Sequence, residues 1–190
     1  MLISENNLSV RVAEENDFNN MVDYFLKADN QFLQGMGVDP EKLPKRGEWL
    51  TLLLDDHKKD IENKGFYYII WLLENMPVGH SNINKIIFGK EAYMHLHFWR
   101  SDKRQKGFGF EFMKLCIPYY FNSFKLKKIY CEPYALNPGP NKILKKLGFD
   151  FIKQYETTPG RINFYQPVNR WCLDIDIYKL LFKDMNLGSF

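Results

Sequence analysis

Apolar residues recur along the 190-residue chain in two periods, one typical of strands and one typical of helices. Alternating or continuously apolar runs rich in β-branched and aromatic residues predict strands, and apolar positions at i, i+3 and i+4 predict helices. Strands are predicted at 8–13, 66–73, 77–87, 92–99, 128–135, 150–156 and 162–175. Helices are predicted at about 17–28, 46–63, 108–121 and 137–148, with a short last helix before the tail.

The order of these elements predicts a mixed α/β fold. A strand and helices come first, antiparallel strands follow, and the chain then alternates strand, helix, strand and helix before a final strand pair. A chain of this length can bury one sizeable core, so residues 1–190 are expected to form a single domain. Between residues 31 and 45, Gly and Pro interrupt the pattern and predict a long loop.

Composition and charge narrow the possible partners. The formal net charge is +3 and 45% of the residues are hydrophobic, which is ordinary for a soluble globular protein. This charge is far from the basic excess of a typical nucleic-acid-binding domain. The start of the sequence lacks the pattern of a signal peptide, and the longest apolar runs are too short to cross a bilayer. We therefore expect a cytoplasmic protein with neither a nucleic acid nor a membrane as partner.

The three cysteines, Cys116, Cys131 and Cys172, show no CxxC spacing. Their odd number and wide separation give no disulfide framework and no zinc-site pattern, so we expect buried, reduced thiols. No other part of the sequence has the spacing of a metal site. We therefore expect no bound metal.

The stretch RQKGFGF, from Arg104 to Phe110, joins a predicted strand to a predicted helix. At such a junction several backbone N–H groups and the helix dipole favour an anion, most often a phosphate. Gly107 and Gly109 would let the chain curve closely around it, and Arg104 and Lys106 would add positive charge. The stretch is neither a P-loop, GxxxxGK[ST], nor the dinucleotide fingerprint GxGxxG.

The pattern R-x-x-G-x-G in this context resembles the pyrophosphate-binding motif of the GNAT superfamily of N-acetyltransferases, usually written Q/R-x-x-G-x-G/A. In that family a strand precedes the motif, a helix and a strand follow it, and a helix that begins near an Asn ends in Gly-Phe. Here the Asn is Asn137, and the last pair is Gly148 and Phe149. The resemblance covers roughly residues 66–172.

The resemblance implies the GNAT fold, a mixed and mostly antiparallel sheet flanked by helices and open at the acyl-CoA site. It implies acetyl-CoA as co-substrate. It also implies that the strand end at Phe98 and Trp99 pairs with the pantetheine arm through backbone hydrogen bonds, and that Asn137 contacts the cofactor. The implied pyrophosphate cradle consists of Arg104, Gln105, Lys106, Gly107, Phe108 and Gly109.

Acyl transfer to an amine needs a group that takes a proton from the amine. His95 and His97 alternate on one predicted strand and therefore share a face. Glu132 begins the sequence EPYALN, which resembles the D/E-P-x-x-x-N of aminoglycoside- and siderophore-type acetyltransferases. We expect His95 as general base, with Glu132 positioning the amine or sharing that role. The alternative is that both histidines are ordinary sheet residues satisfied by their neighbours.

The chain departs from the family pattern at Leu144, where many members have a Tyr that protonates the leaving thiolate. The sequence of this helix, NKILKKLGF, is more similar to that of the ribosomal-protein alanine acetyltransferases. Tyr130, Tyr134 or water could serve as the acid, and the sequence does not choose among them. Cys131 is the one cysteine near enough to the site to test as an acyl carrier.

The resemblance therefore implies direct transfer of an acetyl group from acetyl-CoA to a primary amine, either a protein N-terminus or a small molecule. The loop at 31–48 mixes acidic and basic residues, so a peptide or small metabolic amine is favoured over a polycationic antibiotic. Three alternatives stay open: an aminoglycoside- or siderophore-type acetyltransferase, a noncatalytic acyl-CoA-binding domain, and, less favoured, a nucleic-acid-binding module. A homodimer also stays open.

Overall fold

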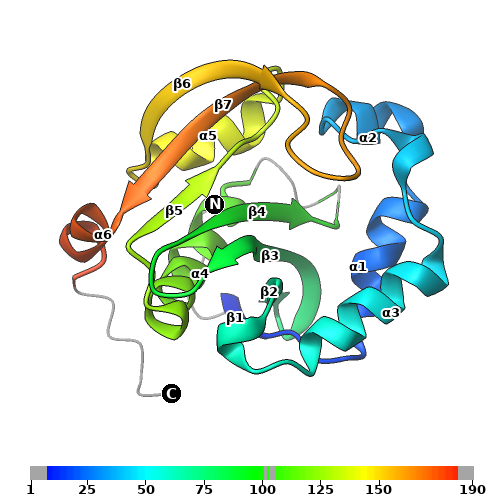
Figure 1. The fold of residues 1–190 in the computed structure, drawn as a ribbon, viewed down its shortest axis with the longest axis horizontal. Helices are drawn as coiled ribbons and strands as arrows, with labels where there is room; N and C mark the ends of the chain where they lie inside the picture. Colours follow the sequence, from blue (N-terminus) through cyan, green and yellow to red (C-terminus); the bar gives the residue numbers. More distant parts are fainter. Residues whose placement is uncertain (1–7, 101, 103–105, 184–190) are drawn as a thin grey trace.

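A seven-stranded sheet forms the centre of the protein, with the order β1-β2-β3-β4-β5-β7-β6 (Figure 1). The computed structural model describes residues 8–100, 102 and 106–183. All neighbouring strands are antiparallel except β4 and β5, which are parallel, so the predicted α/β class and mostly antiparallel sheet are confirmed. The strands are β1 Leu8–Val12, β2 Phe66–Leu73, β3 Met76–Ile87, β4 Glu91–Phe98, β5 Lys128–Cys131, β6 Asp150–Thr157 and β7 Gln166–Asp174.

Helices cover both faces of the sheet. They are α1 Asp17–Leu26, α2 Asn30–Gly35, α3 Arg46–His57, α4 Phe108–Phe124, α5 Pro138–Lys146 and α6 Ile175–Leu181, with short 3₁₀ turns η2 Pro40–Lys42 and η3 Ile61–Asn63. Within the described part of the chain, none of these helices is long and apolar enough to cross a membrane.

The predicted loop at 31–45 was wrong, because this segment contains α2 and η2. Each of these short helices is capped at its start by an aspartate whose backbone is extended. The side chain of Asp29 accepts the N–H of Phe32, and the side chain of Asp39 accepts the N–H of Glu41. Such caps satisfy the free N–H groups of a first turn, which lets a Gly- and Pro-containing segment fold into helical turns.

Two hydrophobic layers hold the sheet between its helices. On one face α4 packs against β2, where the ring of Trp71 stacks on Phe112 with centroids 5.1 Å apart. The indole N–H of Trp71 also donates to Cys116 Sγ at 3.2 Å. On the opposite face, Phe18 and Ile70 belong to the cluster that joins α1 and α3 to the sheet. All three cysteines are free and buried, as predicted.

The parallel pair β4–β5 is short. Only three residue pairs join the two strands, from Glu91–Lys128 to Tyr93–Tyr130. β4 continues beside β3 as far as Phe98, whereas β5 ends at Cys131, four residues before the predicted end. Pro133 follows shortly afterwards and has no N–H to donate to a sheet. The two strands therefore diverge, and a gap opens on the β5 side of the second half of β4.

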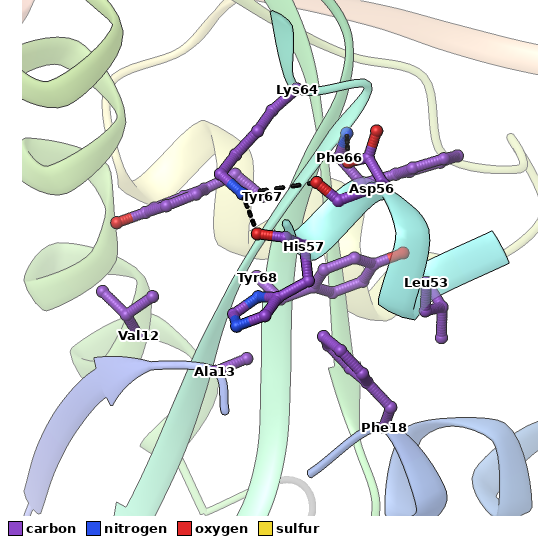
Figure 2. A pocket seen from close by; sticks show the side chains of 10 residues that line it. All are labelled: Val12, Ala13, Phe18, Leu53, Asp56, His57, Lys64, Phe66, Tyr67 and Tyr68. Atoms are coloured by element: carbon purple, nitrogen blue, oxygen red, sulfur yellow. Dashed lines mark hydrogen bonds between the residues drawn. The ribbon is translucent and has the colours of Figure 1, made fainter. Parts of the chain in front are cut away.

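Asp56 fastens the end of α3 to the start of β2 (Figure 2). Its buried carboxylate accepts the N–H groups of Gly65 and Phe66, both at 2.8 Å, and the ammonium of Lys59 at 2.8 Å. Beside it, the Lys64 ammonium donates to the carbonyl of His57 at 2.6 Å. The cavity that these residues line holds about 40 Å³, too little for anything larger than water.

We predict that Asp56→Ala lowers the free energy of unfolding by about 2–3 kcal/mol, because two partly buried N–H groups lose their acceptor. Asp55→Ala is the matched control, since Asp55 is the exposed neighbour on the same helix. The control should change stability by at most about 0.5 kcal/mol. Urea titration of both variants measures the difference, and equal values would contradict the role given to Asp56.

Candidate active site

A cavity of about 600 Å³ lies beside the gap between β4 and β5. Its walls come from α1 and α3, from β3 and β4, from the residues that follow β5, and from the loop that joins β6 and β7. Cavities of this volume typically hold small molecules. The predicted catalytic residues His95, His97 and Glu132 and the predicted cofactor residue Asn137 all line it.

Imidazole rings form one wall of the cavity. In the antiparallel pair β3–β4, His80 stands opposite His97 and Asn82 opposite His95, so the four side chains share one face. The rings of His80 and His97 stack with centroids 4.8 Å apart. The indole N–H of Trp99 donates to His80 Nδ1 at 2.8 Å, so neutral His80 carries its proton on Nε2.

His80 was missed in the sequence analysis. It lies on the strand predicted at 77–87, but only the pairing register places it opposite His97. The tight turn at Glu74–Asn75 fixes how β2 and β3 pair and places His80 opposite Ile70. The register of β3 with β4 cannot be read from that turn and had to come from the fold.

The three histidines of the cavity are neutral at pH 7. Burial lowers the pKa of His80 to about 3 and the pKa of His95 to about 4, and the positive charge of Lys85 adds to the effect at His95. Burial also holds the pKa of His97 well below the usual 6.5. Among the described residues, neither His95 Nε2 nor His97 Nδ1 has a hydrogen-bond partner, although both atoms are buried.

Glu132 is held by an ionic cluster on the β7 side of the cavity. Its carboxylate accepts the hydroxyl proton of Tyr155 and pairs with the Arg170 guanidinium at 3.4 Å. Arg170 in turn donates to the hydroxyl of Tyr93 at 3.0 Å. Burial raises the pKa of Tyr155, and the hydrogen bond to Glu132 and its charge add to the shift. The charge of Glu132 is therefore already compensated, and within the described chain no hydrogen bond joins it to His95.

The glycine loop leads into α4 as predicted. Gly107 is the residue before the helix and has a φ of +84°, a conformation that favours glycine. Gly109 lies in the first turn, where an added Cβ would stand 3.0 Å from Ile143 Cδ1 of α5. Phe108 is the first residue of the helix, and Lys106 is exposed just before it. Arg104 and Gln105 lie outside the described residues.

Three residues expected to contact the cofactor have structural partners of their own. The backbone N–H of Trp99 donates to Val78 O at 2.8 Å, so this N–H is engaged with β3 and does not face the gap. The ring of Phe98 packs against Trp71 on the α4 face. The Asn137 side chain accepts the N–H of Gly139 and caps α5. Cofactor contacts of Phe98, of the Trp99 carbonyl and of Asn137 stay predictions.

The structure distinguishes among the residues considered as proton donor or as acyl carrier. Leu144 is fully buried in the core, so α5 places no polar group there. Tyr134 lines the cavity, whereas the ring of Tyr130 is covered by the Arg170 guanidinium at 4.3 Å. The thiol of Cys131 donates to Met94 O at 2.9 Å, and burial raises its pKa, so it is not a thiolate. Among the described residues, no group of three His, Cys, Asp or Glu side chains could hold a metal ion.

A known protein family matches most of the chain. Residues 7–150 match the family described as "Acetyltransferase (GNAT) domain". No curated protein matches the chain at a significant level.

Solved structures share the fold at low sequence identity. A ribosomal L7/L12 alpha-N-protein acetyltransferase, RimL, with coenzyme A has a TM-score of 0.72 and 16% identity over 91% of this chain and 97% of its own. Spermidine N-acetyltransferase from Vibrio cholerae with CoA and spermine has a TM-score of 0.73 and 18% identity over 92% and 99%. Aminoglycoside acetyltransferase AAC(6')-Ib with coenzyme A has a TM-score of 0.68 and 12% identity over 91% and 98%.

We predict that the imidazole signals of His80, His95 and His97 do not titrate as the pH falls from about 8 to about 5, because their lowered pKa values keep the rings neutral. Proton NMR measures this, with each signal assigned by its loss in a His→Gln variant. A midpoint near the ordinary value of about 6.5 would contradict the burial described here. The contribution of these histidines to stability follows from the same shifts. It is fully present above about pH 6.5 and is lost as the pH falls toward about 4, because the unfolded chain then binds protons that the buried rings do not.

Proposed function

Because the chain belongs to the GNAT acetyltransferase family, we propose that it transfers an acetyl group from acetyl-CoA directly to the nitrogen of a primary amine. The observation that carries this proposal is the cavity at the β4–β5 gap, which has neutral imidazoles along one wall. The amine nitrogen forms a bond to the thioester carbon, the carbon–sulfur bond breaks, the amine loses a proton, and the thiolate gains one.

The start of α4 is the part of the proposed site that would hold the pyrophosphate of the co-substrate. Gly107 leaves the first N–H groups of the helix without side-chain caps, and the helix dipole adds a partial positive charge there. Lys106 stands next to this end of the helix. Three of the similar structures contain coenzyme A, which supports the assignment of acetyl-CoA.

His95 would accept the proton of the acceptor amine. It lies on β4 just past the point where β4 and β5 separate, and its neutral ring offers a lone pair. The burial and the Lys85 charge that lower the pKa of His95 would also act on an ammonium ion bound beside it. The pKa of the amine would therefore fall as well, so that a larger share of the bound amine would be neutral and nucleophilic at pH 7.

A noncatalytic acyl-CoA-binding domain is the second candidate, and Leu144 motivates it. This residue fills the core where many family members place the tyrosine that protonates the thiolate. The described structure offers Tyr134 in the cavity as a replacement. The two candidates differ in one measurable respect, because only the enzyme releases free thiol from acetyl-CoA when an amine is present.

We predict that acetyl-CoA raises the Tm of the protein in a concentration-dependent way and that Gly107→Val removes most of this shift. Valine at a positive φ costs roughly 1–2 kcal/mol or more, and its side chain would distort the start of α4. Gly89→Val is the matched control, since Gly89 also has a positive φ, of +73°, but lies at the β3–β4 turn with open space around it. Equal loss of the Tm shift in both variants would contradict the assignment of Gly107 and the start of α4 to the pyrophosphate site.

We predict that His95→Ala lowers kcat by about 10²-fold, the lower end of what a general base contributes, and leaves the Tm shift with acetyl-CoA unchanged. The substrate is the best amine from a panel of short peptides, amino acids, amino alcohols and diamines. Thiol release measures the rate, and His57→Ala, outside the cavity, is the control. If wild type and His95→Ala bind acetyl-CoA but neither releases thiol with any amine, the noncatalytic candidate is correct.

A further inference from the structure

The charges around the cavity are uneven. Of the described residues that line it, Glu132 alone carries a carboxylate, and Arg170 already compensates that charge. Lys85 and Arg161 line the same cavity and are both cationic. The cavity as a whole therefore disfavours ligands that carry more than one positive charge.

Lys85 is an exposed residue at the edge of the cavity, and two contacts hold its ammonium there. Its ammonium donates to the carbonyl of Pro159 at 2.9 Å and lies 4.7 Å from the centre of the Tyr93 ring. These contacts link β3 to the loop between β6 and β7. The charge of Lys85 also reaches inward, since it contributes to the lowered pKa of His95.

The remaining polar groups of the wall are uncharged and incompletely paired. Within the described chain, buried Asn84 Oδ1 and Gln166 Oε1 have no hydrogen-bond partner, and the same holds for His95 Nε2 and His97 Nδ1. All four residues line the cavity. Buried polar atoms are normally satisfied, so these atoms mark a wall suited to neutral polar groups of a ligand or to ordered water.

Two loops join to form a fixed side of the cavity. Val38 pairs with Asn163, and the backbone N–H of Asp39 donates to Ile162 O at 2.8 Å. The carbonyl of Gly37 accepts the side-chain amides of Asn163 at 2.7 Å and Gln166 at 2.8 Å. Figure 1 shows α2, which precedes these residues, close to the loop between β6 and β7.

Gly37 makes this junction possible. Its φ is +82°, and an added Cβ would stand 2.0 Å from Gln166 Oε1. The contact is therefore built closely and is not a chance approach of two flexible loops. Together with the volume of about 600 Å³, it limits the space available to an acceptor.

We infer that the acceptor is a small amine without a second positive charge, and that Lys85 at the edge of the cavity discriminates against cationic acceptors. This inference rests on the proposed function and names its substrate class. It separates this chain from the Vibrio cholerae spermidine acetyltransferase structure, which contains the polycation spermine. The discrimination is electrostatic: a second ammonium would approach Lys85 and Arg161, and among the described residues that line the cavity no free carboxylate balances it.

The test uses three acceptors of one size and shape that differ in a single group. They are 4-(aminomethyl)benzoate, 4-(aminomethyl)benzyl alcohol and 1,4-bis(aminomethyl)benzene, whose far ends are a carboxylate, a hydroxyl and a second ammonium. We expect kcat/KM for the carboxylate and the alcohol to exceed that for the diamine at least about tenfold, the usual scale of a discriminating contact. Thiol release from acetyl-CoA measures all three.

Lys85→Gln should reduce the ratio of carboxylate to diamine at least about threefold, as expected when a discriminating charge is removed. The ratio is the readout because a change in the basicity of His95 would affect the three acceptors alike. Lys90→Gln is the matched control, an exposed lysine nearby in the sequence but outside the cavity. Arg161→Gln is the second variant and should move the ratio in the same direction.

Three outcomes overturn the inference, and they differ from one another. A diamine used as well as the carboxylate, by a protein that binds acetyl-CoA and releases thiol, removes the charge discrimination but leaves the proposed function intact. A tripeptide such as Ser-Ala-Ala used tenfold better than all three amines removes the small-molecule class. No thiol release with any acceptor removes the proposed function itself, and the inference with it.

Discussion

The separation of β4 from β5 is the constraint on which the rest of the structure depends. Only three residue pairs hold the two parallel strands together, and β5 stops at Cys131, just before Glu132 and Pro133. β4 is kept in place by its long antiparallel pairing with β3, so it remains a strand as far as Phe98. The unpaired side of β4 and the cavity beside it therefore exist because β4 continues along β3, whereas the chain at and after β5 follows β7.

Burial determines the chemistry of this cavity more than any single contact does. The imidazoles of β3 and β4 lie under α1, where Phe25 packs against His97 with ring centroids 5.1 Å apart. Desolvation keeps the rings neutral, and the Trp99–His80 hydrogen bond fixes the proton of one of them. On the other side of the cavity, the Glu132–Arg170 pair confines a charge that could otherwise bind a cation. A neutral, aromatic and amide-lined wall results.

The sequence alone determined the local structure well, because local structure depends on local patterns. The hydrophobic periods predicted the seven strands and the main helices, and the loop RQKGFGF predicted the glycine before α4, whose φ is indeed positive. The family followed from the same motif and was confirmed by the match over residues 7–150. The errors were local as well: Asp29 and Asp39 cap short helices in a segment read as a loop, and β5 ends early.

Only the tertiary structure decided which distant residues meet. His80 joins His97 through the β3–β4 register, Arg170 from β7 neutralises Glu132, and Lys85 reaches the loop after β6. None of these pairs is close in sequence, and a shift of one residue in strand register would turn each side chain to the opposite face. The sequence by itself therefore determined the elements, the glycine loop and the candidate histidines. The charge and the closure of the cavity were decided by long-range packing, since both depend on contacts between segments far apart in the chain.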